Sequence, residues 1–113
     1  MKIYHNPRCS KSRQTLAILN EKKIKFEIIE YLKDNLRKSE LKAILEKLEI
    51  NPIELVRKNE SIWKENYKDK NLSDKEIIHA MINYPKIIER PIVINGKKAV
   101  IGRPPENVLK IID

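Results

Sequence analysis

The residues with the clearest capacity for chemistry lie between positions 3 and 16, in the stretch IYHNPRCSKSRQTL. Cys9 is the only cysteine of the chain, and a helix is expected to begin directly after it. A thiol at a helix N-terminus faces unpaired backbone N–H groups and the positive end of the helix dipole, and both favour the thiolate. Arg8, Lys11 and Arg13 add positive charge nearby. A lone cysteine is most often a small buried side chain, but these polar neighbours favour a nucleophile.

The composition is basic and poor in cysteine. The 113 residues carry 24 Lys and Arg against 16 Asp and Glu, a formal net charge of +8. A positive protein attracts nucleic acid, acidic partners or small oxyanions, but most of the excess is lysine scattered among acids, as on a solvated surface. Few aromatic residues and no basic run argue against nucleic acid as a partner.

Several classes of site and location are excluded on the same grounds. One cysteine cannot form an internal disulfide, and no segment has the character of a signal peptide or a membrane span. One cysteine and two distant histidines give no metal-ligand spacing, so neither a metal nor a bound cofactor is expected. We therefore expect a soluble cytoplasmic protein that binds no membrane, and we take a monomer as the default.

The first third of the chain reads as a strand–helix–strand unit. A strand is predicted at 2–5, a helix at 10–21 and a second strand at 25–31. Phe26 and Ile28 alternate with charged residues and are the expected inward side chains. A unit this compact forms a parallel pair of strands with a right-handed crossover.

The rest of the chain is predicted to be a helical insert followed by a hairpin and a helix. The insert covers roughly residues 36–85. PIVIN at 91–95 reads as a strand, and the Asn-Gly pair at its end favours a tight turn into a strand at 97–101. A final helix should follow and bury Val108, Leu109 and Ile112.

This order of elements is the thioredoxin arrangement. We predict an α/β fold over residues 1–113, a single domain whose four-stranded mixed sheet is built from a βαβ unit and a ββα unit around the insert. Pro91 opens the third strand, where thioredoxin-like folds place a cis-proline facing the cysteine.

Four segments, spread over nearly the whole chain, resemble those of one protein family and follow that family's order. They are IYHNPRCSKSRQTL at 3–16, LVRKNE at 55–60, ERPIVI at 89–94 and GRPPE at 102–106. The chain is similar to the arsenate reductases of the glutaredoxin-coupled ArsC type. The resemblance implies that Cys9 is the nucleophile. It further implies three anion-binding arginines, which are Arg57, Arg90 and Arg103.

The resemblance also implies supporting residues and partners. His5 opens the HNP loop and is expected to help keep the cysteine ionised. Ser12 stands where thioredoxins carry a second redox cysteine, and we expect it to cap the helix or to donate a hydrogen bond to the thiolate. Arsenate is the implied substrate, with glutathione as co-substrate and glutaredoxin as protein partner. Because the chain has no resolving cysteine, it needs an external thiol to complete a redox cycle.

Two other functions remain open. Spx-type regulators, which bind RNA polymerase, share the fold and the RPI segment, but they usually carry Cys-x-x-Cys and lack the GRP segment. This chain has Ser12 in place of the second cysteine and keeps Gly102-Arg103-Pro104. The second alternative is a general glutathione-dependent thiol oxidoreductase without arsenate activity.

Overall fold

The structure, a computed structural model, describes residues 1–34 and 36–112. Residues 35 and 113, which the predicted domain includes, lie outside this described part. None of the helices within it combines the length and the apolar character that a membrane crossing requires.

Contacts between residues divide the chain into two compact units. Unit 1 comprises Met1–Asp34 and Arg90–Asp113, and unit 2 comprises Asn35–Glu89. The boundaries of unit 2 enclose the helical insert predicted at 36–85. A single domain over the whole chain stays a prediction.

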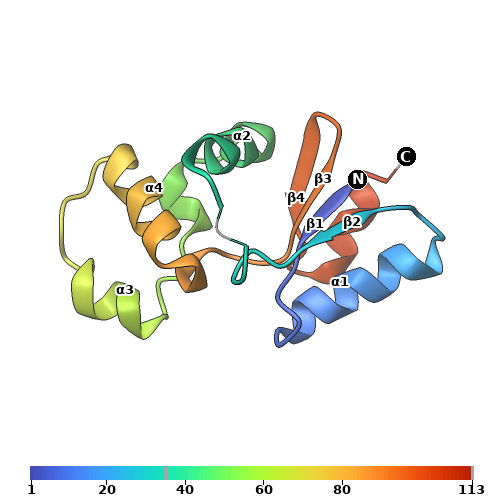
Figure 1. The fold of residues 1–113 in the computed structure, drawn as a ribbon, viewed down its shortest axis with the longest axis horizontal. Coiled ribbons are helices and arrows are strands. Elements are labelled where there is room, and N and C mark those ends of the chain that lie inside the picture. Colours follow the sequence, from blue (N-terminus) through green and yellow to red (C-terminus); the bar gives the residue numbers. More distant parts are fainter. Residues whose placement is uncertain (35, 113) are drawn as a thin grey trace. The chain divides into compact units, whose positions relative to one another are not determined.

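Unit 1 is built on a four-stranded sheet with the order β2-β1-β3-β4 (Figure 1). Its strands are β1 (Lys2–Tyr4), β2 (Glu27–Ile29), β3 (Ile92–Asn95) and β4 (Lys98–Ile101). β1 pairs in parallel with β2 and antiparallel with β3, and β3 pairs antiparallel with β4. The mixed sheet of the thioredoxin-like fold is therefore confirmed.

One face of this sheet is covered by α1 (Ser10–Glu21) and by the 3₁₀ helix η3 (Pro105–Lys110), as Figure 1 shows. Their contact with the strands forms a core cluster of buried side chains: Ile3, Leu19, Val93, Val108 and Ile111. Burial of each large apolar side chain stabilises the fold by roughly 1.5–3 kcal/mol. This packing fixes α1 against the sheet and so fixes the position of its N-terminus.

The inner face of the final helix differs from the prediction. Leu109, expected inside, is 44% exposed, and Ile111 is 5% exposed in its place. The reason is the helix type: η3 is a 3₁₀ helix with three residues per turn, so positions three apart share a face. Pro105, Val108 and Ile111 are accordingly buried.

The second strand is also shorter than predicted. Only Glu27–Ile29 of the predicted 25–31 stretch is a strand. Phe26 is half-buried, as expected, but Ile28 is 48% exposed. β2 is an edge strand, so its side chains lie at the border of the core rather than inside it.

Unit 2 consists of helices. They are α2 (Lys38–Leu48), η1 (Pro52–Leu55), α3 (Ser61–Asn66), α4 (Asp74–Asn83) and η2 (Pro85–Ile87). α2 and α4 lie side by side (Figure 1), and the apolar faces that they bury include Leu41 and Ile44 on α2 and Ile77 and Met81 on α4. Each unit thus has buried apolar side chains of its own.

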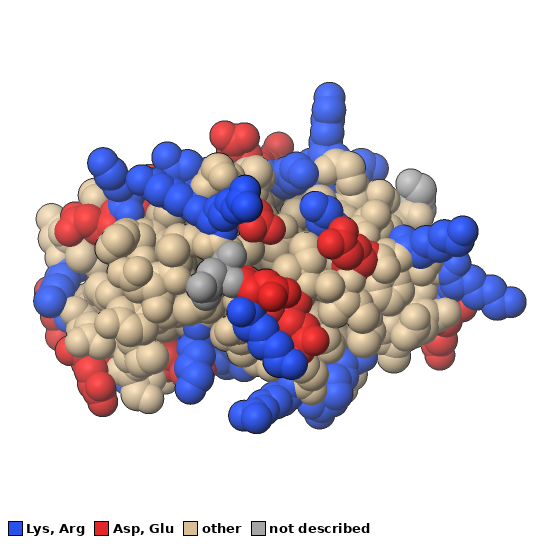
Figure 2. Space-filling view, viewed as in Figure 1, with Lys and Arg blue, Asp and Glu red and all other residues tan. Residues whose placement is uncertain are grey.

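Charged side chains are interleaved on the face that Figure 2 shows. Lys and Arg side chains are distributed widely over it, with Asp and Glu between them. This mixture of both signs of charge has the character of a solvated surface.

Candidate active site

Cys9 occupies the N-cap position of α1, as the sequence predicted. Its backbone is extended (φ −95°, ψ 123°), and its N–H donates to Asn6 O at 3.0 Å while its carbonyl accepts from Arg13 N–H at 3.0 Å. No side chain caps the helix, and its first turn holds no acidic residue. The positive end of α1 is therefore not neutralised from within its own first turn and can attract an anion to this position.

Arg103 is the arginine that the structure brings to the sulfur. Its Nη2 lies 3.5 Å from Cys9 Sγ, and its Nε donates to Arg90 O at 2.9 Å. A guanidinium at this place can donate charge-assisted hydrogen bonds to an anionic group beside the sulfur, and such hydrogen bonds are the stronger ones. Cys9 is only 7% exposed. The polar residues around it in the sequence had suggested a more exposed side chain.

The segment that carries Arg103 packs closely against α1 and β3. Gly102 N–H donates to Pro91 O at 2.9 Å. A Cβ atom at Gly102 would lie 2.5 Å from Thr15 Oγ1 and 2.8 Å from Pro91 Cγ, so only glycine permits this approach. The Arg90–Pro91 bond is cis, as the resemblance implied, and Arg103–Pro104 is cis as well. Cys9, Arg103, Pro91 and the backbone of Arg90 are thus gathered within unit 1.

His5 and Ser12 form a buried pair beside the Cys9 loop. His5 Nδ1 and Ser12 Oγ lie 2.6 Å apart, and Asn6 N–H donates to the same oxygen at 3.1 Å. Burial lowers the pKa of His5, with Arg13 acting in the same direction and Glu30 opposing it. The imidazole is therefore neutral at neutral pH. The expected roles of His5 and Ser12 toward the thiolate stay predictions, and a neutral His5 would act through hydrogen bonds rather than charge.

Arg57 belongs to unit 2, and its side chain contacts two carboxylates there. Its Nη1 lies 2.6 Å from Glu60 Oε1, and its Nε lies 3.4 Å from Glu89 Oε1. Arg57 follows Val56, the extended C-cap residue of η1, and its backbone N–H donates to Ile87 O at 2.7 Å. The sequence analysis missed both carboxylates, although Glu60 lies three residues after Arg57 in the LVRKNE motif. Proximity of Arg57 to Cys9 stays a prediction.

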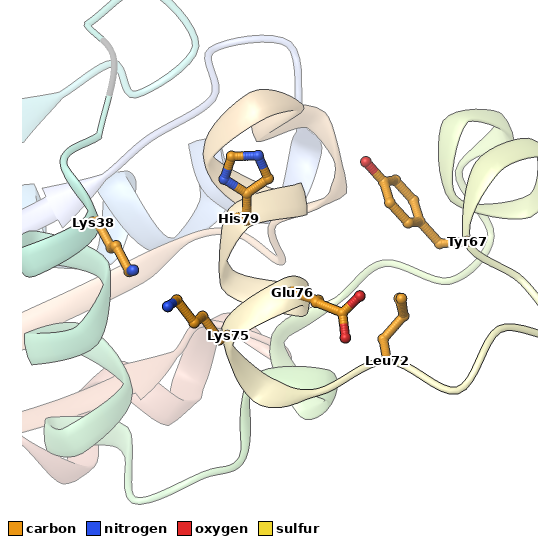
Figure 3. A pocket seen from close by; sticks show the side chains of 6 residues that line it. All are labelled: Lys38, Tyr67, Leu72, Lys75, Glu76 and His79. Carbon is orange, nitrogen blue, oxygen red and sulfur yellow. The ribbon is translucent and has the colours of Figure 1, made fainter.

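Unit 2 also contains a pocket of about 310 Å³. Its lining residues are Lys38, Tyr67, Leu72, Lys75, Glu76 and His79. In Figure 3, Lys38 and Lys75 lie on one side of α4 and the Tyr67 ring on the other. Burial, assisted by Tyr84, raises the pKa of Tyr67, so its phenol stays protonated. The pocket includes none of the residues predicted for the thiol site.

Comparison with known proteins places the chain in a family. Residues 4–111 match the model of the ArsC family. The chain belongs to the ArsC family. Arsenate reductase of Haemophilus influenzae is 46% identical over 112 residues, which cover 97% of each chain. The uncharacterized protein YfgD of Escherichia coli is 47% identical over 114 residues, covering 99% of this chain and 96% of that protein.

A solved structure agrees with this assignment. Arsenate reductase from Vibrio cholerae superimposes with a TM-score of 0.93 at 45% identity, covering 99% of this chain and 98% of that one. The family resemblance that the four sequence segments predicted is therefore confirmed for this ArsC chain, together with its fold.

Proposed function

We propose that this ArsC-family protein reduces arsenate to arsenite through Cys9, with glutathione and glutaredoxin as electron donors. The observation that carries the proposal is the contact of Arg103 Nη2 with Cys9 Sγ at 3.5 Å, at the N-cap of α1. It provides a nucleophilic sulfur and an oxyanion-binding group at one place. Relatives named arsenate reductase at 40–46% identity over nearly their full length support the choice of substrate.

The charge of the substrate explains why arginines are needed. Arsenate is a tetrahedral oxyanion that carries about two negative charges near neutral pH, so it repels an approaching thiolate. Guanidinium groups bind oxyanions as bidentate forks and neutralise that charge. Arg103 is placed to do so beside the sulfur, and we assign the same role to Arg90 and Arg57.

The proposed reaction has four steps. The Cys9 thiolate displaces one arsenate oxygen, which leaves as water, and an S–As bond forms. The thiol of glutathione displaces a second oxygen, also as water. A glutaredoxin thiolate then attacks the glutathione sulfur, and the S–As electron pair remains on arsenic, which is reduced from As(V) to As(III). Water hydrolyses the remaining Cys9–arsenic bond and releases arsenite and the thiol.

The need for external thiols follows from the thiol count, and the resemblance implies that these thiols are glutathione and glutaredoxin. Cys9 is the only sulfur nucleophile of the chain, so the chain cannot form its own disulfide at the reduction step. The two electrons must come from outside as two thiols, which leave joined as a mixed disulfide.

A coupled assay tests the proposal. Arsenate, glutathione, glutaredoxin and glutathione reductase are combined with NADPH, and NADPH oxidation is followed at 340 nm. We expect turnover with the complete mixture, loss of turnover when any one component is omitted, and loss of turnover in Cys9→Ser. Circular dichroism of Cys9→Ser should match the wild type, because the replacement alters one atom and serine is favoured at the N-cap of a helix.

The same assay separates the alternatives. Turnover in Cys9→Ser would contradict the mechanism. Reduction of a glutathione mixed disulfide without arsenate turnover would instead favour a general thiol oxidoreductase, and binding of RNA polymerase without either activity would favour an Spx-type regulator.

A further inference from the structure

The segment that carries Arg103 is held by contacts that the proposed reaction does not itself use. Arg103 N–H donates to Ile101 O at 2.8 Å, and Gly102 N–H donates to Pro91 O at 2.9 Å. Arg103 reaches Cys9 with a long side chain, so the place of its guanidinium depends on where this backbone lies. A shift of about 1 Å in such a group can cost as much as a hundredfold in rate.

Asn107, in η3, spans this segment with its side-chain amide. Its Nδ2 lies 3.2 Å from Ile101 O and 3.1 Å from Arg103 O. Both partners are carbonyl oxygens, so only the NH₂ end of the amide can pair with them, and both of its protons are used. The backbone N–H of Asn107 adds a bond to Pro104 O at 3.0 Å. Asn107 therefore donates to three carbonyl oxygens of this segment, those of Ile101, Arg103 and Pro104.

The other contacts of the segment restrict it further. Gly102 packs against Thr15 and Pro91 so closely that there is no room for a Cβ atom, and Thr15 is fully buried. Arg103 Nε is bound to Arg90 O. Loss of the Asn107 amide would leave two carbonyl oxygens without these donors and would allow the segment to move away from α1.

We propose that Asn107 is a positioning residue of the Cys9 site, which acts by holding the Arg103 guanidinium against the sulfur. The inference rests on the proposed function in one respect, namely that Arg103 serves the reaction of Cys9 with an oxyanion. Asn107 itself touches neither the sulfur nor the substrate.

Asn107→Asp is the variant that tests this role, because it keeps the shape of the side chain and replaces both donating protons by an oxygen. Asn95→Asp is its matched control. Asn95 Nδ2 also donates to a backbone carbonyl of unit 1, that of Ile111, and Asn95 is half-buried like Asn107. Asn107→Ala, which introduces no charge, is the second variant should the aspartate destabilise the fold.

Two measurements are made on each variant. The first is the pH profile of Cys9 alkylation by iodoacetamide. The midpoint of this profile reports ionisation of the sulfur, and its plateau reports how accessible the sulfur is to the reagent. The second is kcat/KM for arsenate. We expect Asn107→Asp to move the midpoint upward and to lower kcat/KM about tenfold, as a displaced positioning group does, whereas Asn95→Asp changes neither.

A double-mutant comparison shows whether Asn107 acts through Arg103. In an Arg103→Ala background, Asn107→Asp should have no further effect on either measurement, because the group that it positions is absent. Equal effects with and without Arg103, or identical behaviour of the Asn107 and Asn95 variants, would overturn the inference. A shifted midpoint in a protein without arsenate turnover would sink the proposed function and leave the positioning role standing.

Discussion

Arg103 in unit 1 and Arg57 in unit 2 were both predicted to bind the anion, but the groups around the two guanidinium groups differ in charge. Arg103 Nη2 faces the Cys9 sulfur, and its Nε donates to a backbone carbonyl. Arg57 is paired with the carboxylates of Glu60 and Glu89. A carbonyl leaves the charge of a guanidinium in place, whereas two carboxylates more than neutralise it.

The difference indicates two ways in which an arginine can contribute to an anion-binding site, either directly or after it releases a carboxylate. Arg103 is already oriented and charged toward the nucleophile, so it can stabilise both the thiolate and the developing charge of the reaction. In the role that we propose for it, Arg57 must exchange at least one carboxylate before it binds an oxyanion. Its contribution should therefore appear in substrate affinity, reduced by competition with Glu60 and Glu89.

Replacing each arginine by alanine gives the largest expected effects. Arg103→Ala should lower kcat/KM for arsenate by about one to two orders of magnitude, since a hydrogen bond to a charged group contributes about 1.5–3 kcal/mol. It should also slow alkylation of Cys9 at pH 7, because the sulfur loses its charged donor. Arg57→Ala should raise KM and leave the alkylation rate at its wild-type value.

Arg57→Ala is thus the matched control for the loss of one positive charge. If both variants slow alkylation equally, the distinction between the two arginines fails, and only the net charge of the protein matters to the sulfur. If neither variant affects arsenate kinetics, both assignments fall.

The position of Cys9 was predictable because local signals determine it. The polar HNPRC loop, the helical periodicity after Ser10 and the chain order of the strands all agree, and the structure follows them. The final helix was less predictable, because Val108, Leu109 and Ile112 fit an α-helical face as well as Val108 and Ile111 fit a 3₁₀ face. Only packing against the sheet decides between these two periods.

The surroundings of the arginines were not predictable in the same way. The sequence marks Arg57, Arg90 and Arg103 through their motifs, and the contact of Arg57 with Glu60 is local, three residues along the chain. Two other contacts join residues that are distant in the chain. Glu89 lies 32 residues after Arg57, and Arg103 lies 94 residues after Cys9. No local pattern encodes such pairs.

Neutralising Glu60 should give a smaller effect of opposite sign. Glu60→Gln removes the carboxylate nearest to Arg57, so arsenate no longer competes with it. A partly exposed ion pair contributes at most about 1 kcal/mol, which predicts a KM for arsenate about two- to fivefold lower. Initial-rate kinetics at fixed ionic strength provide the measurement.

Glu65→Gln, on α3, is the control for this experiment. It makes the same change in net charge at an exposed residue that forms no ion pair within the described residues. An equal decrease of KM in both variants would mean that general electrostatic attraction is responsible, and the pairing of Arg57 would then have no bearing on substrate affinity.

The smallest expected effect concerns His5, the buried imidazole beside the Cys9 loop in unit 1. Burial lowers the pKa of His5 in the folded state below its ordinary value of about 6.5. The folded protein then binds fewer protons than the unfolded chain, so this group's contribution to stability is complete above that value and is lost as the pH falls through the folded pKa.

We therefore expect the wild type to lose more stability between pH 7.5 and pH 5 than His5→Asn does, measured as the free energy of unfolding in urea. His79→Asn controls for the loss of an imidazole at an exposed position. A His5 that is charged in the folded state would give the opposite sign, with the wild type gaining stability relative to His5→Asn on acidification. That outcome would add an imidazolium to the cations around the Cys9 loop, among them Arg13 and Arg103, and the effect of Arg103→Ala on alkylation would then have to be compared with that of His5→Asn.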